Sequence, residues 1–327
     1  MSSGRPDLPE RETEISSRSG ERRRTQPGGE VEVGDSPGHF CYTALNFVKT
    51  GLLWNTYLGD LEWFRVSARS YSKFARGWNF AKCLVPNPHY QAFRPICEEH
   101  GIFLCGFDEW PEAGFNSHQA MQCRGDEHFP EADVIFHVDA DCVFASDCTP
   151  DDWLPGGKVL LPFTDFHRFL DRPLVPDEDK TFMGFTGKRI DFDRGQYFWK
   201  FAADFALGFP VERETMAWMP IAHVREVYAK TREVIESRFR KSFDSYVRSC
   251  RNSFPQAFAE FNTLGGVAHR FFQDRYQWQD VTTQGYPFAG KVVQCWSHGG
   301  FHRPHEFGRE VGGYQTPHEL FSRLGLL

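Results

Sequence analysis

The chain lacks the long apolar runs and the short motifs that mark several classes of protein. No apolar run in its 327 residues approaches the roughly 20 residues that span a bilayer. The N-terminal residues contain no apolar segment of the kind that is typical of a signal peptide. There is also no GxGxxG motif, no Walker phosphate loop and no internal repeat. We therefore expect no transmembrane segment, and any nucleotide site must be built without these motifs.

The chain also has fewer basic than acidic residues. The chain has 37 Lys and Arg residues against 44 Asp and Glu residues, which gives a net charge of -7. This balance argues against a dedicated duplex-DNA-binding protein, which would present a basic face. The nine cysteines are odd in number and form no CxxC pair, so neither a zinc cluster nor a disulfide scaffold is indicated. Free thiols indicate a reducing compartment, and we expect a cytoplasmic protein.

The N-terminal segment is poor in the residues that form a core. Residues 1–37 contain four aliphatic residues and no aromatic residue. Such a segment cannot bury enough apolar surface to offset the entropy of ordering, so we predict a disordered tail over these residues. We place a single folded domain at residues 38–327, with a first half at 38–150 and a second half at 151–327.

In the first half, apolar runs typical of strands alternate with amphipathic runs typical of helices. The expected strands lie at residues 39–48, 80–86, 102–107 and 132–144. The expected helices lie at residues 60–76, 90–101 and 117–125, and Asp60 is placed to cap the first of them. This alternation predicts an α/β fold, with a mixed, mostly parallel, Rossmann-like sheet flanked by helices. The second half is less regular, although residues 221–250 have a helical pattern.

The most informative segment is the apolar run Val134–Val138, which ends in Asp139-Ala140-Asp141. In open parallel sheets, ligands bind outside the carboxyl ends of the strands. Two carboxylates there are costly unless a positive charge lies beside them. Mn²⁺ and Mg²⁺ prefer oxygen ligands and commonly lie between one or two carboxylates and substrate phosphates. The pattern favours a Mn²⁺ (or Mg²⁺) site at Asp139 and Asp141 that holds a nucleotide diphosphate, and the alternative is a solvated β-turn.

A second motif, His298-Gly299-Gly300, lies near the C-terminal end of the sequence. The imidazole could complete a Mn²⁺ site. Gly299 would let a backbone amide approach phosphate oxygens. The alternative is a surface loop with an incidental histidine.

Taken in order, these pieces resemble a glycosyltransferase of the GT-A fold over roughly residues 40–300. The matching pieces are Tyr57 with Asp60-Leu61-Glu62, Gln119, Asp139-Ala140-Asp141 and the segment from Phe258 to Gly265. The resemblance implies a single GT-A domain, Rossmann-like in layout, that uses a nucleotide-sugar donor. It favours a UDP-sugar, and it leaves the acceptor open among a glycan, a small molecule, a protein and a modified nucleic-acid base.

The resemblance also implies roles for individual residues at the donor site. Asp141 would bind the metal, with Asp139 on the metal or the ribose, and His298 would be a further ligand of the metal or the diphosphate. Three further positions would contact the donor: the stretch from Thr43 to Asn46 at the base, Asp108 at the uracil or ribose, and Gln119 in the pocket lining. Related sequences often carry Lys where this chain has Gln122.

An inverting transfer also needs a base for the acceptor hydroxyl, and a carboxylate commonly supplies it. Glu260 and Asp204 are the candidates, because each lies in an aromatic segment near glycine after the Asp-x-Asp sequence. The alternative for Glu260 is a helix N-terminal carboxylate stabilised by the helix dipole. The alternative for Asp204 is a purely structural role. Retention and inversion of configuration are not distinguished by the sequence.

Two other functions compete with the transferase. A haloacid-dehalogenase-like phosphatase would use Asp139 as nucleophile and Asp141 as general acid. Its Asp-x-Asp sequence follows the first strand, whereas here three predicted strands come before it. A non-catalytic nucleotide- or glycan-binding protein could share the same fold.

Overall fold

The computed structural model describes residues 48–166, 192–217, 219–251, 257–297, 300–302 and 313–327. They belong to one of the two compact units of the chain, Phe47–Leu327. The predicted tail at residues 1–37 lies outside the described residues, and so does the predicted strand at 39–48 except for Val48. The proposed start of the domain at residue 38 therefore stays a prediction.

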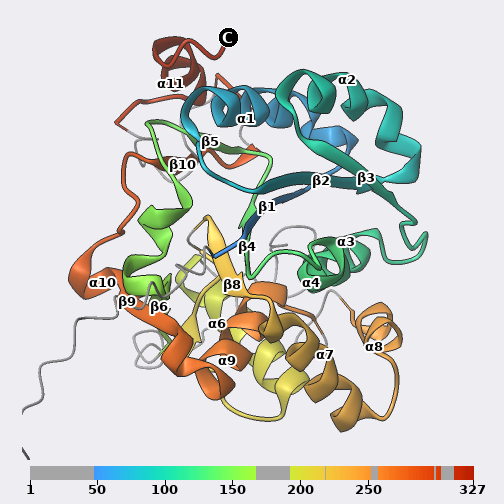
Figure 1. The fold of residues 1–327 in the computed structure, drawn as a ribbon. Coiled ribbons are helices and arrows are strands. Elements are labelled where there is room, and N and C mark those ends of the chain that lie inside the picture. The colour runs from blue at the N-terminus through green and yellow to red at the C-terminus, as the bar shows by residue number, and fades with distance from the viewer. Residues whose placement is uncertain (1–47, 167–191, 218, 252–256, 298–299, 303–312) are drawn as a thin grey trace, which may run out of the picture. The chain divides into compact units, whose positions relative to one another are not determined.

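A five-stranded sheet in the order β3-β2-β1-β4-β8 organises this unit (Figure 1). Its strands are β1 (Thr50–Asn55), β2 (Phe80–Pro86), β3 (Phe103–Phe107), β4 (Val134–Val138) and β8 (Ile221–Val224). The first four run parallel to their neighbours, and β8 is antiparallel to β4. The prediction of an α/β fold with a mostly parallel mixed sheet is confirmed.

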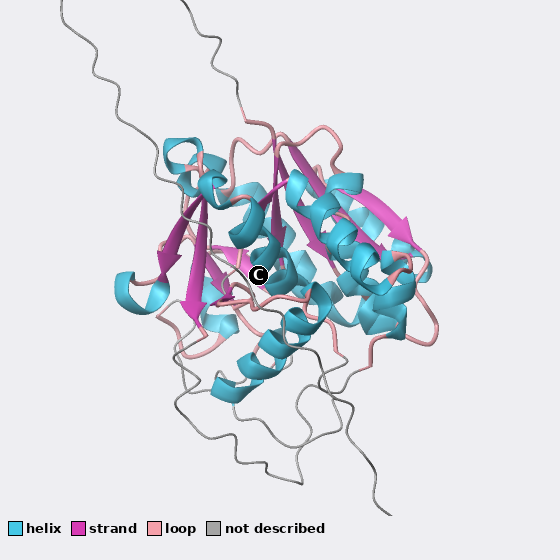
Figure 2. Ribbon diagram, turned by 90° about the horizontal axis from the view of Figure 1, so that it is seen from below, coloured by secondary structure: helices cyan, strands magenta, loops and turns pink. Residues whose placement is uncertain are grey.

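Helices cover both faces of this sheet (Figures 1 and 2). The longer ones are α1 (Leu61–Phe74), α2 (Tyr90–His100), α3 (Gly114–Gln122), α6 (Phe192–Leu207), α7 (Glu226–Phe239) and α9 (Glu260–Phe271). The shorter ones are α4 (Gly125–His128), α8 (Phe243–Ser249), α10 (Val281–Gln284) and α11 (Pro317–Arg323). Single 3-10 turns lie at η1 (Leu58–Asp60), η2 (Asn87–His89), η3 (Pro150–Trp153), η4 (Pro155–Gly157) and η5 (Gln273–Arg275). Within the described residues, no helix combines the length and apolar composition that a bilayer span requires.

Strands β1 and β4 are buried on both faces of the sheet, which explains their nearly continuous apolar sequences. Trp54 of β1 donates a 3.0 Å hydrogen bond to the Ser67 hydroxyl of α1. On the opposite face, His137 of β4 lies 2.7 Å from the hydroxyl of Tyr228 on α7 and packs against the Phe261 ring of α9. Successive residues of a strand point to opposite faces, so Asp139 shares a side with His137. The end of β4 therefore points toward α9.

The C-terminal part of the chain completes the fold by pairing with earlier strands. β5 (Cys142–Phe144) pairs with β10 (Val292–Gln294), and β6 (Val159–Asp165) pairs with β7 (Arg213–Glu214) and β9 (Tyr276–Asp280). Because β4 pairs with β8 and β5 with β10, the two halves of the sequence share their sheets. The pairing of β5 with β10 brings residues near 295 beside the Asp-x-Asp sequence.

Two local predictions are wrong. The helical prediction at 221–250 fails at its start, because Ile221–Val224 is a strand whose buried residues pair with β4. Asp60 does not cap α1 with its side chain. The strand β1 at Thr50–Asn55 was not predicted from the sequence. Thr43 and Asn46 themselves lie outside the described residues.

Candidate active site at the carboxyl edge of the sheet

The site is built where β1 and β4 lie side by side. Strands β2 and β3, which follow β1 in the chain, lie on one side of β1 within the sheet, and β4 pairs on the other side of β1. Ligands of open α/β sheets bind at such a switch point, outside the carboxyl ends of the strands. Trp54 is paired with Val138, so Asn55 and Asp139 are the next residues on the two neighbouring strands.

Both aspartates are held by the last residue of β10 and the residues directly after it. The side-chain amide of Gln294 donates to Asp139 Oδ2 at 3.0 Å, and the backbone N–H of Ser297 donates to Asp141 Oδ2 at 2.7 Å. The backbone N–H of Cys295 donates to the Asp141 carbonyl at 2.9 Å. We call residues 294–297 the return segment. It fixes the orientation of the Asp-x-Asp turn.

The return segment contains a strained residue between its two backbone donors. Trp296 has a φ of 57°, in the left-handed region that a side chain other than glycine rarely adopts. This conformation lets the N–H groups of Cys295 and Ser297 both face Asp141. Strain of this kind persists where the surrounding structure enforces it, and it concentrates at functional sites.

Four carboxylates gather at this edge: Asp60, Asp139, Asp141 and Glu260. Burial raises the pKa of Asp139 well above its usual range, and the charges of Asp141, Glu260 and Asp60 raise it further. Burial also raises the pKa of Asp60, while a hydrogen bond from Ser297 lowers it. The acidic cluster is therefore suited to a cationic partner.

Glu260, the first residue of α9, is only 9% exposed. Burial raises its pKa to about 7, against the effect of hydrogen bonds from its own backbone and from Gln119. The Gln119 amide donates to Glu260 Oε2 and, at 2.8 Å, to the Phe258 carbonyl. Gln119 therefore positions Glu260. The sequence predicted that Gln119 lines the donor pocket, and this role stays a prediction.

Buried polar atoms without partners lie at the same edge. Asn55 donates to the His118 carbonyl at 2.7 Å, which places the end of β1 beside the helix that carries Gln119. Within the described residues, Asn55 Oδ1, Thr56 Oγ1 and Gln119 Oε1 are buried and accept or donate no hydrogen bond. Buried polar atoms are normally satisfied in folded proteins. A ligand at the switch point would supply the missing partners.

The donor set suits a hard divalent cation in part. Asp139 and Asp141 offer carboxylate oxygens, which Mn²⁺ and Mg²⁺ prefer. The described residues contain no group of three or more His, Cys, Asp or Glu side chains arranged to hold a metal. Two protein carboxylates are the usual number where substrate phosphates supply the remaining ligands. His298 and Gly299, the other predicted ligands, lie outside the described residues.

Asp204 and Asp108 are engaged elsewhere. Asp204 accepts from the Lys200 ammonium at 2.7 Å and from the Val211 N–H at 2.6 Å, which closes the turn after α6. Both its oxygens have partners, and neither partner belongs to the acidic cluster. Asp108 is exposed at the end of β3 and accepts from the side-chain amide of Asn87 at 2.6 Å.

Sequence reasoning missed several residues of the site. The strongest examples are Gln294 and Ser297, which were not selected although they lie just before the predicted ligand His298. Only the pairing of β5 with β10 brings them to Asp139 and Asp141. Asp60 was predicted as a helix cap, although its place after the first strand could have suggested the site. Asn55 could have been found as the polar residue that ends the apolar run at 51–54.

A comparison of this chain with known protein families finds no match, and a comparison with curated proteins finds no relative. Function is therefore argued from the geometry of the site.

Proposed function

We propose that the chain is a metal-dependent glycosyltransferase of the GT-A fold. It would transfer a sugar from a nucleotide-diphosphate donor, with UDP-sugars the favoured class, to a hydroxyl acceptor. One observation carries the proposal: Asp139 and Asp141 lie at the carboxyl end of β4, at the switch point of the sheet, in a cluster of four carboxylates. This is the edge at which nucleotides bind in open α/β folds.

Asp139 and Asp141 would hold Mn²⁺ or Mg²⁺ together with the donor diphosphate. A bound cation would stabilise the negative charge that develops on the leaving nucleoside diphosphate. Gln294 and Ser297 keep the two carboxylates in orientation through their hydrogen bonds. Asn55, Thr56 and Gln119 present buried polar atoms that suit the donor's ribose or base.

Glu260 is the better candidate for the base that accepts the proton of the acceptor hydroxyl in an inverting reaction. Its pKa of about 7 is close to neutral pH, where a general base is most effective. Gln119 holds one carboxylate oxygen and thereby orients the other. Asp204 is less suited, because Lys200 and Val211 already occupy both its oxygens.

The phosphatase is a weaker proposal. In that family the Asp-x-Asp sequence follows the first strand, whereas three strand-and-helix units precede β4 in this chain.

The proposal is tested by calorimetric titration of the full chain with UDP, GDP, UDP-glucose, UDP-GlcNAc and GDP-mannose. Each titration is run with Mn²⁺ and with EDTA. We expect Mn²⁺-dependent binding of the nucleotides of one base, weakened at least about 100-fold in Asp141→Asn. Asp133→Asn is the matched control, because Asp133 lies at the opposite end of β4, where it accepts from the Lys49 N–H. It should bind as the unchanged protein does.

Three outcomes would contradict the proposal. Nucleotide binding that persists in EDTA would show that no metal is needed. Equal losses in the two variants would show a general effect on the fold. No binding of any nucleotide would exclude the nucleotide-dependent transferase and favour the phosphatase.

A further inference from the structure

Aromatic and basic side chains alternate on a surface where the C-terminal turns of α6 and α9 meet α7. These three helices pack on one another, on the face of the sheet opposite α1 and α2 (Figure 1). We call this region the basic-aromatic surface, and it comprises Phe205, Phe209, Lys230, Arg238, Arg270 and Phe271. None of these residues belongs to the acidic cluster.

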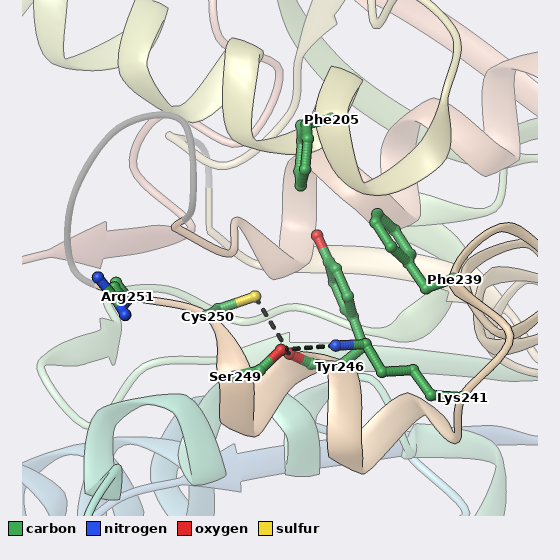
Figure 3. A pocket seen from close by; sticks show the side chains of 7 residues that line it. All are labelled: Phe205, Phe239, Lys241, Tyr246, Ser249, Cys250 and Arg251. Atoms are coloured by element: carbon green, nitrogen blue, oxygen red, sulfur yellow. Dashed lines mark hydrogen bonds between the residues drawn. The ribbon is translucent and has the colours of Figure 1, made fainter.

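One end of the surface is built around Arg238. Its guanidinium lies 5.9 Å from the ring centroid of Phe205 and 5.3 Å from that of Phe239. Figure 3 shows these two rings, whose centroids are 5.6 Å apart, near the ends of α6 and α7. Arg238 Nε donates to the Phe205 carbonyl at 3.0 Å, and Nη1 lies so close to Gly208 that a side chain at Gly208 would collide with it.

The other end is built around Arg270. Its guanidinium lies 4.4 Å from the ring centroid of Phe209 and 5.9 Å from that of Phe271, and the two rings are 6.1 Å apart. The Lys230 ammonium lies 5.1 Å from the Phe271 centroid. Because Gly208 and Phe209 are consecutive residues, these contacts join both ends into one continuous surface.

The outer parts of the surface are open to solvent. Phe205 is 40% exposed and Phe271 is 44% exposed. Arg238 and Arg270 are exposed as well, and within the described residues neither of them forms an ion pair. Helix C-termini favour cations, which explains why basic residues lie here but not why two phenyl rings face water. Exposed apolar groups that gather on one surface mark an interaction site.

Two carboxylates lie in the same region. Glu233 pairs with Lys230 at 2.7 Å, and the exposed Glu212 lines a groove that also includes Phe209 and Arg270. With Lys230 paired, the excess positive charge of the surface comes from the two arginines.

The cations follow one another along the surface and do not surround a single point. This arrangement suits a partner that presents many negative charges, as a bilayer with anionic lipids does. Phenyl rings enter the boundary between head groups and acyl chains, while cations contact the lipid phosphates and carboxylates. A single-stranded nucleic acid would instead need open ring faces for its bases, and here a cation lies over each of Phe205, Phe209 and Phe271.

We propose that the basic-aromatic surface docks the protein onto a membrane that carries anionic lipids. The attachment is peripheral and reversible, because a few rings and cations supply a limited number of contacts. The inference goes beyond the proposed transferase and does not depend on it, since docking requires neither the acidic cluster nor a metal nor a nucleotide.

The test is co-sedimentation of the full chain with vesicles, in EDTA and without nucleotide. One set of vesicles contains phosphatidylcholine alone, and in the other about one third of it is replaced by phosphatidylserine. We expect a partition coefficient at least about tenfold higher for the phosphatidylserine vesicles, and a fall at about 0.5 M salt, which screens exposed charges. Equal partition onto both sets, or none onto either, would overturn the proposal.

Variants locate the docking surface. Arg270→Gln should lower the partition coefficient about fivefold, whereas Arg270→Lys, which keeps the charge, should lower it by less than about twofold. Phe271→Ala should lower it about fivefold, because a ring no longer enters the bilayer. Glu212→Gln should raise it about threefold. The control Arg94→Gln removes a positive charge on α2, across the sheet, and should have no effect.

Two further outcomes would contradict the proposal. A loss in Arg94→Gln equal to that in Arg270→Gln would show that only the net charge matters. A single-stranded oligonucleotide of thymidine is titrated in parallel and followed by fluorescence anisotropy. If the oligonucleotide binds and the phosphatidylserine vesicles do not, the surface recognises nucleic acid and membrane docking is wrong.

Discussion

Glu260 and Glu214 are two buried glutamates with different surroundings. Burial raises the pKa of each to about 7. Glu214, at the end of β7, accepts from the backbone N–H groups of Met216 at 2.6 Å and Ala217 at 3.0 Å. Among the described residues, no other carboxylate contributes to its raised pKa, whereas Glu260 adds to the charge around Asp139. A raised pKa alone therefore does not identify a catalytic carboxylate, and the gathering of several acidic groups at a switch point is the stronger sign.

The largest difference between the two glutamates is expected in turnover. Glu260→Gln should lower the kcat of donor hydrolysis by about 10²- to 10⁴-fold, because it removes the proposed base. The nucleotide affinity of Glu260→Gln should change by less than about threefold. Glu214→Gln should lower kcat by less than about threefold. Steady-state kinetics with Mn²⁺ and the nucleotide sugar identified by titration measure both effects. A similar loss in both variants would remove the distinction, and a loss of nucleotide affinity alone would make Glu260 a binding residue.

The next largest effect concerns the stability of the protein as a function of pH. The folded-state pKa of Glu214 lies above its ordinary value of 4.5, so the folded protein binds a proton that the unfolded chain releases. The stabilisation is complete below about pH 4.5 and is lost as the pH rises to about 7. The free energy of unfolding should therefore fall with rising pH by up to about 3 kcal/mol less in Glu214→Gln than in the unchanged protein.

Urea unfolding near pH 5 and pH 8 measures this difference. Glu260→Gln should behave in the same way without ligand. Mn²⁺ with nucleotide should then reduce the part of the pH dependence of unfolding that is due to Glu260. The part that is due to Glu214 should stay unchanged, because only Glu260 lies in the acidic cluster. An identical response of the two variants to the ligand would contradict the placement of Glu260 at the binding site.

The smallest effect is expected for Ser297→Ala. The Ser297 hydrogen bond lowers the pKa of Asp60, so its loss should raise that pKa further and make the cluster less negative as the pH falls. The backbone N–H on Asp141 remains. Mn²⁺-dependent nucleotide affinity should fall about threefold at the low end of the pH range in which the protein stays folded, and by less as the pH rises. Ser146→Ala, which removes a hydroxyl bonded to the Gly290 carbonyl, is the control, and an equal loss there would contradict the role of Asp60.

The parts of the site that local sequence predicted are those in which one segment carries both the position and the chemistry. Val134–Val138 is an apolar strand that ends directly in two aspartates, so its position at the sheet edge followed from its sequence. The same local reasoning selected Asp204. It could not show that the turn after α6 directs the Val211 N–H onto that carboxylate.

Two of the failures share one physical reason, because each depends on pairing between distant segments. Ile221–Val224 is a strand because it lies beside β4, and residues 294–297 reach the aspartates because β10 pairs with β5. The run at 39–48 and the run at 50–55 are both apolar. Only the second is shown to have strands on both sides.

The return segment also has a consequence for the order in which the protein is made. All four carboxylates precede residue 261, whereas Gln294, Cys295 and Ser297, which hold the two aspartates, are added later. A chain released from the ribosome after residue 260 but before residue 294 therefore contains every acidic group of the site and none of the three donors that orient the Asp-x-Asp turn. The orientation of the turn thus depends on a segment that is made later than all four carboxylates, and such truncated products would carry the charge without the geometry.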